Sequence, residues 1–236
     1  MLKDDYIDIF IVGDVDETEM KNLFKKYFKI DTYKKIKNDI LVEELKPRKR
    51  LKKITKEEPA NGSQLTLLCT LNKLNDFERK YSLLVYNEIL GGNSTSLLFN
   101  TVREKNSYAY YINSNSKAYD NILLIYSGIE NGNSENVLKL IKKTLQRMNK
   151  GDFKDEILAS AKETIISSIK ASTDSPAGII NTYYAKVLVG SLSPEERIEN
   201  INNVTKEDII NLSKKIAIHT VYLLDGGIKE ENNEED

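Results

Sequence analysis

The chain has 236 residues, a formal net charge of −1 and a 40% share of hydrophobic residues, which is enough for one large or two small domains. The balanced charge argues against nucleic acid or an anionic membrane surface as partner. The single cysteine, Cys69, excludes an internal disulfide. No apolar stretch approaches the roughly 20 residues of a membrane span, and no signal-peptide pattern opens the chain. We therefore expect a cytoplasmic protein without a membrane segment.

The first part of the chain alternates between strand and helix patterns. In chain order these are a strand over residues 6–13, a helix capped by Asp16 or Thr18, a strand over 63–71, a helix capped by Asp76 and running to Leu90, and a helix starting at Asn93 or Ser94. Between them, residues 46–53 form a basic run. Its charges fit a solvated linker or an edge strand better than a docking patch for an acidic partner.

The second part predicts a hairpin followed by helices. Strands over 108–115 and 122–130 turn at 117–121, and helices then begin at Ser134, at residue 154, at 174–176, at 193–196 and at 205–208, before a last strand over 220–224. A hairpin followed by clustered helices indicates an α+β fold, with a mixed, mostly antiparallel sheet packed on one face by helices.

We expect one domain over residues 1–228 and a disordered acidic tail over 229–236. Because the chain opens abruptly on a strand, we expect it to be a fragment of a longer two-domain protein.

The residues that zinc or nucleophilic catalysis would need are missing. A catalytic zinc site takes three protein ligands, whereas this chain has one histidine, His219, and one cysteine in an apolar strand. Neither a His-x-x-Glu-His helix nor a Gly-x-Ser-x-Gly elbow is present. The sequence therefore predicts no catalytic residue, no metal ligand and no cofactor in this chain.

Gly91-Gly92-Asn93-Ser94 is a glycine-rich loop before a helix, but it lacks the Gly-Lys-Ser/Thr ending of a phosphate loop. We interpret it as the end of one helix and the start of the next. A weak site for an anion or carboxylate at the new helix start is the alternative.

Residues 89–110 run from Ile-Leu-Gly-Gly through Val-Arg-Glu-Lys to Tyr-Ala-Tyr. This segment resembles the insulinase/pitrilysin family of inverzincin zinc peptidases, which includes the mitochondrial processing peptidases. Specifically, it is similar to the second domain, which lacks the zinc motif. Weaker matches at 12–15, 151–162 and 204–209 extend the resemblance over nearly the whole chain. The pattern is most similar to non-catalytic members of the family from Gram-positive bacteria.

The resemblance implies the two-layer LuxS/processing-peptidase-like metallohydrolase fold, and it assigns substrate binding to Arg103 and Tyr110. A guanidinium and a phenol both donate hydrogen bonds and can hold a peptide carbonyl. The alternatives are a surface arginine at a helix end, pairing with Glu104 or a carbonyl, and a half-buried strand tyrosine. Two departures from the family pattern bear on the pair: Ser107-Tyr108 replaces Gly-Leu, and Tyr111 can compete with Tyr110.

The resemblance therefore predicts a non-catalytic, peptide-binding or scaffold half that closes a substrate chamber. The expected partners are a peptide or unfolded protein segment, and a preceding amino-terminal domain or a zinc-bearing homologous subunit. Zinc is expected only in that partner. A purely structural partner subunit without substrate contact is the alternative function. A nucleic-acid module using residues 46–53 is disfavoured, because aromatic residues do not alternate with those charges.

Overall fold

A computed structural model describes residues 8–28 and 50–227 of the chain. They form two compact units, of which unit 1 takes in the described residues of 1–40 and 167–198, and unit 2 those of 41–166 and 199–236. The boundaries fall inside helices α4 (Asp155–Thr173) and α6 (Pro194–Asn203). The single domain over residues 1–228 stays a prediction.

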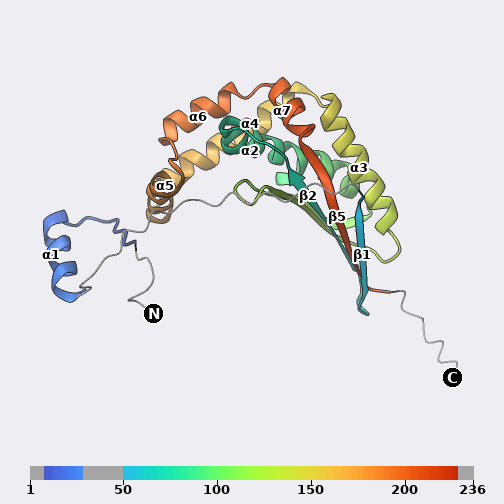
Figure 1. The fold of residues 1–236 in the computed structure, drawn as a ribbon, viewed down its shortest axis with the longest axis horizontal. Helices are drawn as coiled ribbons and strands as arrows, with labels where there is room; N and C mark the ends of the chain where they lie inside the picture. Colours follow the sequence, from blue (N-terminus) through green and yellow to red (C-terminus); the bar gives the residue numbers. More distant parts are fainter. Residues whose placement is uncertain (1–7, 29–49, 228–236) are drawn as a thin grey trace. The chain divides into compact units, whose positions relative to one another are not determined.

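Figure 1 shows the remaining elements along the chain. The other helical segments, with η marking π-helical turns, are α1 (Glu17–Tyr27), η1 (Glu78–Ser82), α2 (Leu83–Asn87), η2 (Glu88–Gly92), η3 (Phe99–Glu104), α3 (Ser134–Lys150), α5 (Pro176–Val189) and α7 (Lys206–Ser213). The strands are β1 (Lys52–Glu57), β2 (Ser63–Leu71), β3 (Ala109–Lys117), β4 (Ile122–Ile129) and β5 (Ile216–Asp225).

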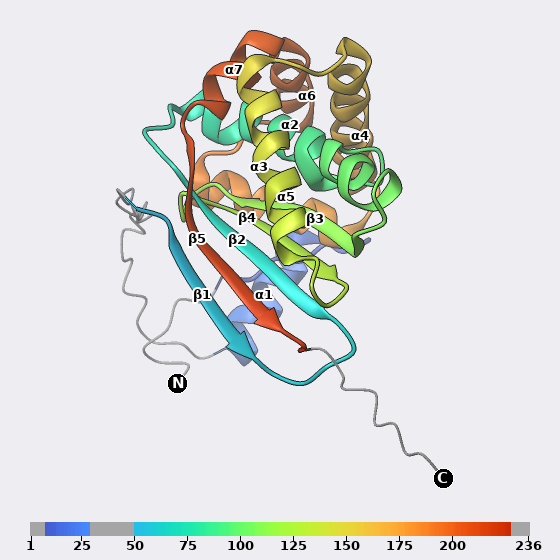
Figure 2. The same ribbon diagram turned by 90° about the vertical axis from the view of Figure 1, so that its right-hand side faces the viewer.

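All five strands belong to one sheet in unit 2, with the order β1-β5-β2-β4-β3. Only β1 and β5 run parallel, and the other three neighbouring pairs are antiparallel. The two edges of the sheet are therefore β1 and β3 (Figure 2). The predicted mixed, mostly antiparallel sheet is confirmed, and so is the predicted hairpin, as β3 and β4.

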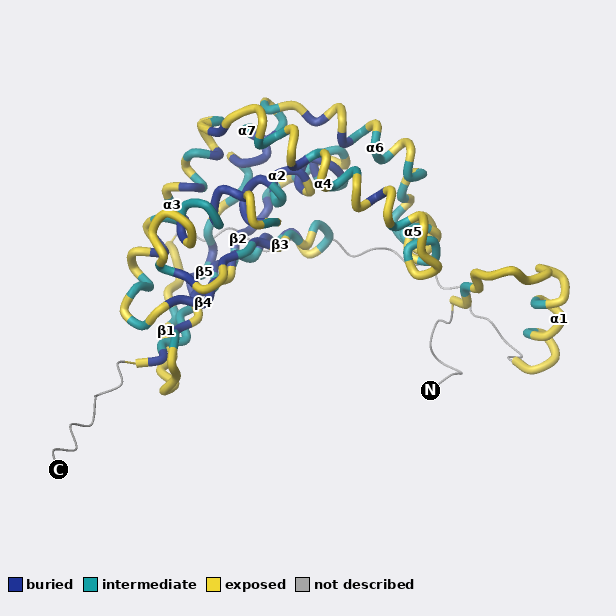
Figure 3. Tube along the Cα trace, turned by 180° about the vertical axis from the view of Figure 1, so that it is seen from behind, coloured by how far each residue is buried: buried dark blue, intermediate teal, exposed yellow. Residues whose placement is uncertain are grey.

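The core of unit 2 lies between this sheet and the helices on one of its faces (Figures 2 and 3). In the central strand β2, Leu65, Leu67 and Cys69 are at most 1% exposed. Gln64, the second residue of the strand, is exposed. This alternation of period two turns one face of the strand toward the helices. It confirms the predicted two-layer packing.

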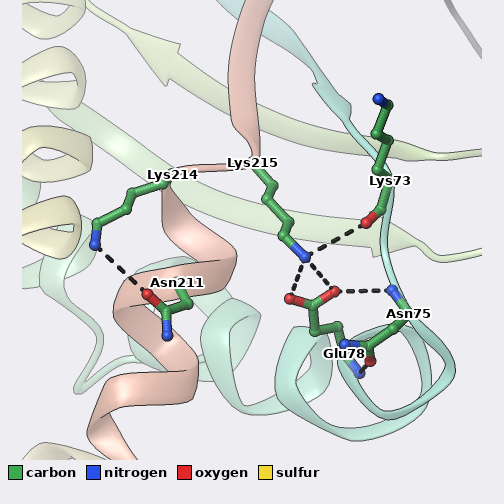
Figure 4. A network of polar contacts seen from close by, with 6 residues as sticks. All are labelled: Lys73, Asn75, Glu78, Asn211, Lys214 and Lys215. Atoms are coloured by element: carbon green, nitrogen blue, oxygen red, sulfur yellow. Dashed lines mark hydrogen bonds and ion pairs between the residues drawn. The ribbon is translucent and has the colours of Figure 1, made fainter.

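A buried carboxylate ties the start of the helical layer to the start of β5 (Figure 4). The Lys215 Nζ lies 2.5 and 2.7 Å from the two Glu78 carboxylate oxygens, and Glu78 is 7% exposed. The same carboxylate accepts a hydrogen bond from the Asn75 backbone N–H at 2.8 Å, and the Asn75 side chain accepts one from the Glu78 N–H. Asn75, rather than the predicted Asp76, therefore caps this helix, because its side chain reaches the third N–H.

The predicted strand over residues 6–13 is wrong for the described residues 8–13, which form no strand. A strand needs a neighbour for its backbone hydrogen bonds, and the described part of unit 1 contains no strand that could supply one. The helix predicted to follow is present as α1, and the Asp16 side chain accepts a hydrogen bond from the Glu19 N–H at 2.8 Å.

The end of the basic run forms the start of the edge strand β1, which confirms the edge-strand interpretation. Residues 46–49, the irregular stretch 31–45 and the predicted acidic tail 229–236 lie outside the described residues.

Candidate functional site

Gly91 brings the helical layer into close contact with β3. A Cβ on Gly91 would stand 2.8 Å from both the backbone nitrogen and the Oγ of Ser114, so only glycine fits this position. Ser114 is buried and its hydroxyl donates to the Asn87 side-chain oxygen at 2.9 Å. The glycine pair therefore ends the preceding helix as predicted and also fixes the next one, η3, beside β3.

The loop after this glycine pair is poorly suited to the anion considered from the sequence. The Asn93 side chain donates to the Glu88 carboxylate at 2.6 Å and accepts from the Thr95 N–H at 2.7 Å. A cavity of about 130 Å³ beside the loop is lined by both Glu88 and Glu156. Two carboxylates at its wall oppose the binding of an anion.

Helix η3 presents Arg103 to solvent because its other side is buried. Leu98 and Val102 are fully buried, and Arg103 is exposed. The Arg103 guanidinium carbon lies 4.8 Å from the centroid of the Phe99 ring, one helical turn earlier. This cation–π contact positions the Arg103 guanidinium, while the N–H groups of the guanidinium remain available to a ligand.

A sharp turn leads from η3 into β3. Ser107 adopts a left-handed conformation, with φ of 53°, which glycine adopts more readily than serine. Its N–H donates to the Arg103 carbonyl at 2.9 Å, and the Tyr108 N–H donates to the Val102 carbonyl at 3.1 Å. The position where the family pattern has glycine thus keeps the glycine-type backbone in this chain.

A β-bulge places Tyr110 outside the regular strand pairing. Ala109 pairs with Ile129 and Tyr111 pairs with Gly128, so Tyr110 is the extra residue. Both tyrosines are consequently exposed, Tyr110 at 58% and Tyr111 at 41%. The Tyr111 ring occupies the space that a Cβ on Gly128 would need, whereas the Tyr110 ring edge lies near Gly62.

Arg103 and Tyr110 therefore come from two elements in contact, η3 and β3, and both side chains are exposed. No hydrogen bond or ion pair joins them within residues 50–227. Among the described residues β3 has a strand neighbour on one side only, so its outer edge offers backbone N–H and C=O groups to an added strand. Arg103, Tyr110 and the outer edge of β3 together form a corner of the domain with two side-chain donors and a strand edge. This set of groups is suited to an extended peptide.

The two residues considered for metal or nucleophilic chemistry are both buried. Cys69 is inaccessible, and its burial raises the pKa of the thiol to about 12. The His219 Nδ1 lies 2.9 Å from the Thr220 hydroxyl, inside the sheet. Among the described residues, no group of three histidine, cysteine, aspartate or glutamate side chains has a metal-binding arrangement.

The chain is similar to proteins of a known family. Residues 1–165 match the family described as the peptidase M16 inactive domain. The chain belongs to the M16 peptidase family. It carries the inactive domain of a peptidase-like protein, and this domain class holds no catalytic zinc.

Two proteins of Bacillus subtilis are among the M16 relatives. The probable inactive metalloprotease YmfF is 33% identical over 228 residues, which are 95% of this chain and 53% of YmfF. The uncharacterized zinc protease YmxG is 28% identical over 59% of this chain and 35% of its own length. The similarity to YmfF agrees with the predicted resemblance to non-catalytic M16 members of Gram-positive bacteria.

Solved structures share the fold. A conserved protein from Enterococcus faecalis superposes with a TM-score of 0.81 at 26% identity, over 91% of this chain and 51% of that one. A protease from Helicobacter pylori gives a TM-score of 0.76 at 15% identity, over 91% and 53%. The chain thus spans about half the length of YmfF and of these two solved structures.

Two further findings concern the surface. None of the helices within 8–28 and 50–227 is long and apolar enough to cross a lipid bilayer. Helix α3 carries a group of basic side chains that our reading of the sequence overlooked. The available signal was five lysines and arginines without an acidic residue over 136–150.

Proposed function

We propose that this M16 domain is a non-catalytic, peptide-binding half that closes a substrate chamber against a zinc-bearing M16 domain or subunit. The observation that carries the proposal is the corner at which exposed Arg103 and Tyr110 lie beside the free edge of β3. The expected ligand is a peptide or an unfolded protein segment.

The binding mode follows from the groups at this corner. An extended peptide adds to the outer edge of β3 through backbone hydrogen bonds, as in other cases of strand addition. Arg103 and Tyr110 then donate to a carbonyl of that peptide and hold it in one orientation. Since the described residues offer no zinc-binding set, this domain binds and orients the peptide and leaves hydrolysis to the partner.

Unit 1 supports the pairing part of the proposal. Helices α1 and α5 contain no buried residue, although α5 reads Ile-Ile-Asn-Thr-Tyr-Tyr-Ala-Lys-Val-Leu-Val. Tyr183 and Val187 are 62% and 68% exposed. Exposed apolar surface of this kind marks an interface. We propose that it docks on the zinc-bearing M16 partner, within the same polypeptide or in a heterodimer.

The test uses the complex with a zinc-bearing M16 partner and a peptide substrate. We expect the double variant Arg103→Ala/Tyr110→Phe to lower kcat/KM about tenfold or more, because hydrogen bonds to a charged or polarised group contribute about 1.5–3 kcal/mol each. The matched control is Arg50→Ala/Tyr126→Phe, which changes the same residue types at exposed positions elsewhere. The chain alone with added zinc should hydrolyse nothing, and activity there would contradict the proposal.

A purely structural role is the second candidate, and one observation favours it. The Arg103 guanidinium already has a local partner in the Phe99 ring at 4.8 Å, which is a packing role without any ligand. Unchanged turnover in the double variant, together with normal assembly, would support this reading. The cytoplasmic location stays a prediction.

A further inference from the structure

Helix α3 carries five basic residues and one acidic residue, Glu135 in its first turn, which pairs with Lys53 at 3.0 Å. Residues 136–150 contain Lys139, Lys142, Lys143, Arg147 and Lys150 and no aspartate or glutamate. Lys139, Lys143 and Arg147 follow one another at intervals of four residues, so they lie on the same side of the helix. The chain as a whole has nearly equal numbers of basic and acidic residues, 35 and 36. Helix α3 is therefore more basic than the chain as a whole.

The folding of the helix does not explain this pattern. Like charges four residues apart destabilise a helix by roughly 0.2–0.5 kcal/mol per pair. Cations in the last turn do favour the negative end of the helix dipole, which accounts for Arg147 and Lys150. That effect fades within one turn, and Glu135 lies four residues before Lys139, so Lys142 and Lys143 remain unexplained. A negative charge from outside the helix would offset the repulsion.

A groove of about 730 Å³ lies where such a charge could bind, between α3 and the end of η3. Its charged lining residues are Lys105 beside η3 and Lys143, Arg147, Lys150 and Asp152 on or just after α3. Asp152 is the acidic member of the lining, and it is engaged by Arg147, whose Nε donates to its carboxylate at 2.9 Å. Lys105, Lys143 and Lys150 are exposed and extend the positive charge along the groove.

We propose that this basic groove, defined by Lys105, Lys143, Arg147 and Lys150, binds an acidic segment of a peptide. The lining also holds the amides of Asn106 and Gln146 and the hydroxyl of Thr101, which match the hydrogen-bonding groups of a peptide backbone. It contains no aromatic side chain, and such side chains are what stack the bases of single-stranded nucleic acid. A peptide therefore fits the lining better than RNA or DNA.

The inference rests on the proposed peptide-binding function and specifies its ligand class. Thr101 of the groove belongs to η3, the same helix that carries Arg103, and Lys105 directly follows it. An acidic segment in the groove would thus lie along the helix whose opposite side presents the proposed carbonyl-binding arginine.

The experiment measures fluorescence anisotropy of a labelled peptide of alternating glutamate and glycine with the full 236-residue chain. We expect Lys105→Gln/Lys143→Gln to weaken binding about tenfold or more, and a rise from 50 to 200 mM NaCl to weaken it similarly. The control Lys52→Gln/Lys214→Gln removes the same net charge from exposed positions in β1 and at the end of α7. Its affinity should stay within about twofold.

The variant is designed to fold. Glutamine and lysine have similar helix propensities, and the change at position 143 relieves two like-charge pairs, so its melting temperature should not fall. An equal loss in the groove and control variants would overturn the proposal, as would equal binding of a neutral glutamine–glycine peptide. Tighter binding of a single-stranded oligonucleotide of the same charge would also overturn it. Because this assay needs neither Arg103, Tyr110 nor a partner, its outcome is independent of the test of the proposed function.

Discussion

The two compact units use their apolar residues in opposite ways. In unit 2 the sheet and its helices enclose the core, and all but one of the buried apolar side chains of the described residues lie there, the exception being Ile169. In unit 1, α1 and α5 bury no residue, although α5 is apolar along most of its length. Figure 3 shows the same contrast between the dark strands of the sheet and the light tube of α1.

Similar apolar residue types therefore have two different roles in this chain. A segment that encloses its apolar side chains gains stability from them within the chain. One that exposes them gains stability only on contact with another surface. Three substitutions test how far this contrast holds, beginning with the largest expected effect.

Leu67→Ala compares the two units directly. Leu67 is inaccessible in the central strand, so the substitution should lower the free energy of unfolding by about 3 kcal/mol, within the usual 2–5 kcal/mol for such cavities. Val187→Ala in α5 is the matched control, because Val187 is 68% exposed, and it should change stability by less than about 0.5 kcal/mol. Denaturant unfolding followed by circular dichroism measures both. A loss at Val187 as large as at Leu67 would break the comparison.

Lys215→Met asks whether unit 2 also depends on a buried polar contact. The substitution leaves the Glu78 carboxylate without its cation, and we expect a loss of about 2–3 kcal/mol, since Lys215 itself is partly exposed. Its neighbour Lys214 makes only a 3.5 Å contact with Asn211, so Lys214→Met should be nearly neutral (Figure 4). Equal melting temperatures for the two variants would show that the carboxylate does not need its partner.

Ser107→Gly tests the turn that carries the candidate site and has the smallest expected effect. Because Ser107 has a φ of 53°, glycine should raise the free energy of unfolding by about 0.5–1 kcal/mol. Asn121 has the same φ, but its side chain accepts a hydrogen bond from Arg79 at 2.9 Å. Asn121→Gly should therefore destabilise the chain. Opposite signs in thermal melts are the expected result, and a destabilising Ser107→Gly would contradict it.

Much of the fold could be predicted because local patterns determine it. The strand patterns over 63–71 and 122–130 predicted β2 and β4, and the predicted turn at 117–121 placed the hairpin between β3 and β4. The Thr205–Asp208 capping box was read from the chain, and the structure contains both of its hydrogen bonds. These features depend on neighbours within a few residues.

Features that depend on distant parts of the chain could not be predicted. The strand-like pattern of 8–13 gave no strand, since pattern alone does not supply a hydrogen-bonding neighbour. The parallel pairing of β1 with β5 joins segments more than 150 residues apart. The sequence of β1, Lys-Lys-Ile-Thr-Lys-Glu, has too few apolar residues to predict a strand in this position.

The candidate site divides in the same way. Arg103 and Tyr110 were identified only through resemblance to a family, and their roles stay predictions. The bulge that exposes Tyr110 depends on the register against β4, which the local sequence of β3 does not encode. The groove beside α3 needs the end of η3 as its other wall, so the run of lysines and arginines by itself gave no site.

The position of β5 has a consequence for how the protein is made. This last strand lies between β1 and β2, so it is the inner neighbour of a strand synthesised about 160 residues earlier. While the ribosome is still translating residues before Ile216, β1 has no strand beside it and β2 has only β4. The sheet therefore closes only once Ile216–Asp225 has been synthesised, and a chain that stops before this strand would expose two unpaired strand edges to aggregation.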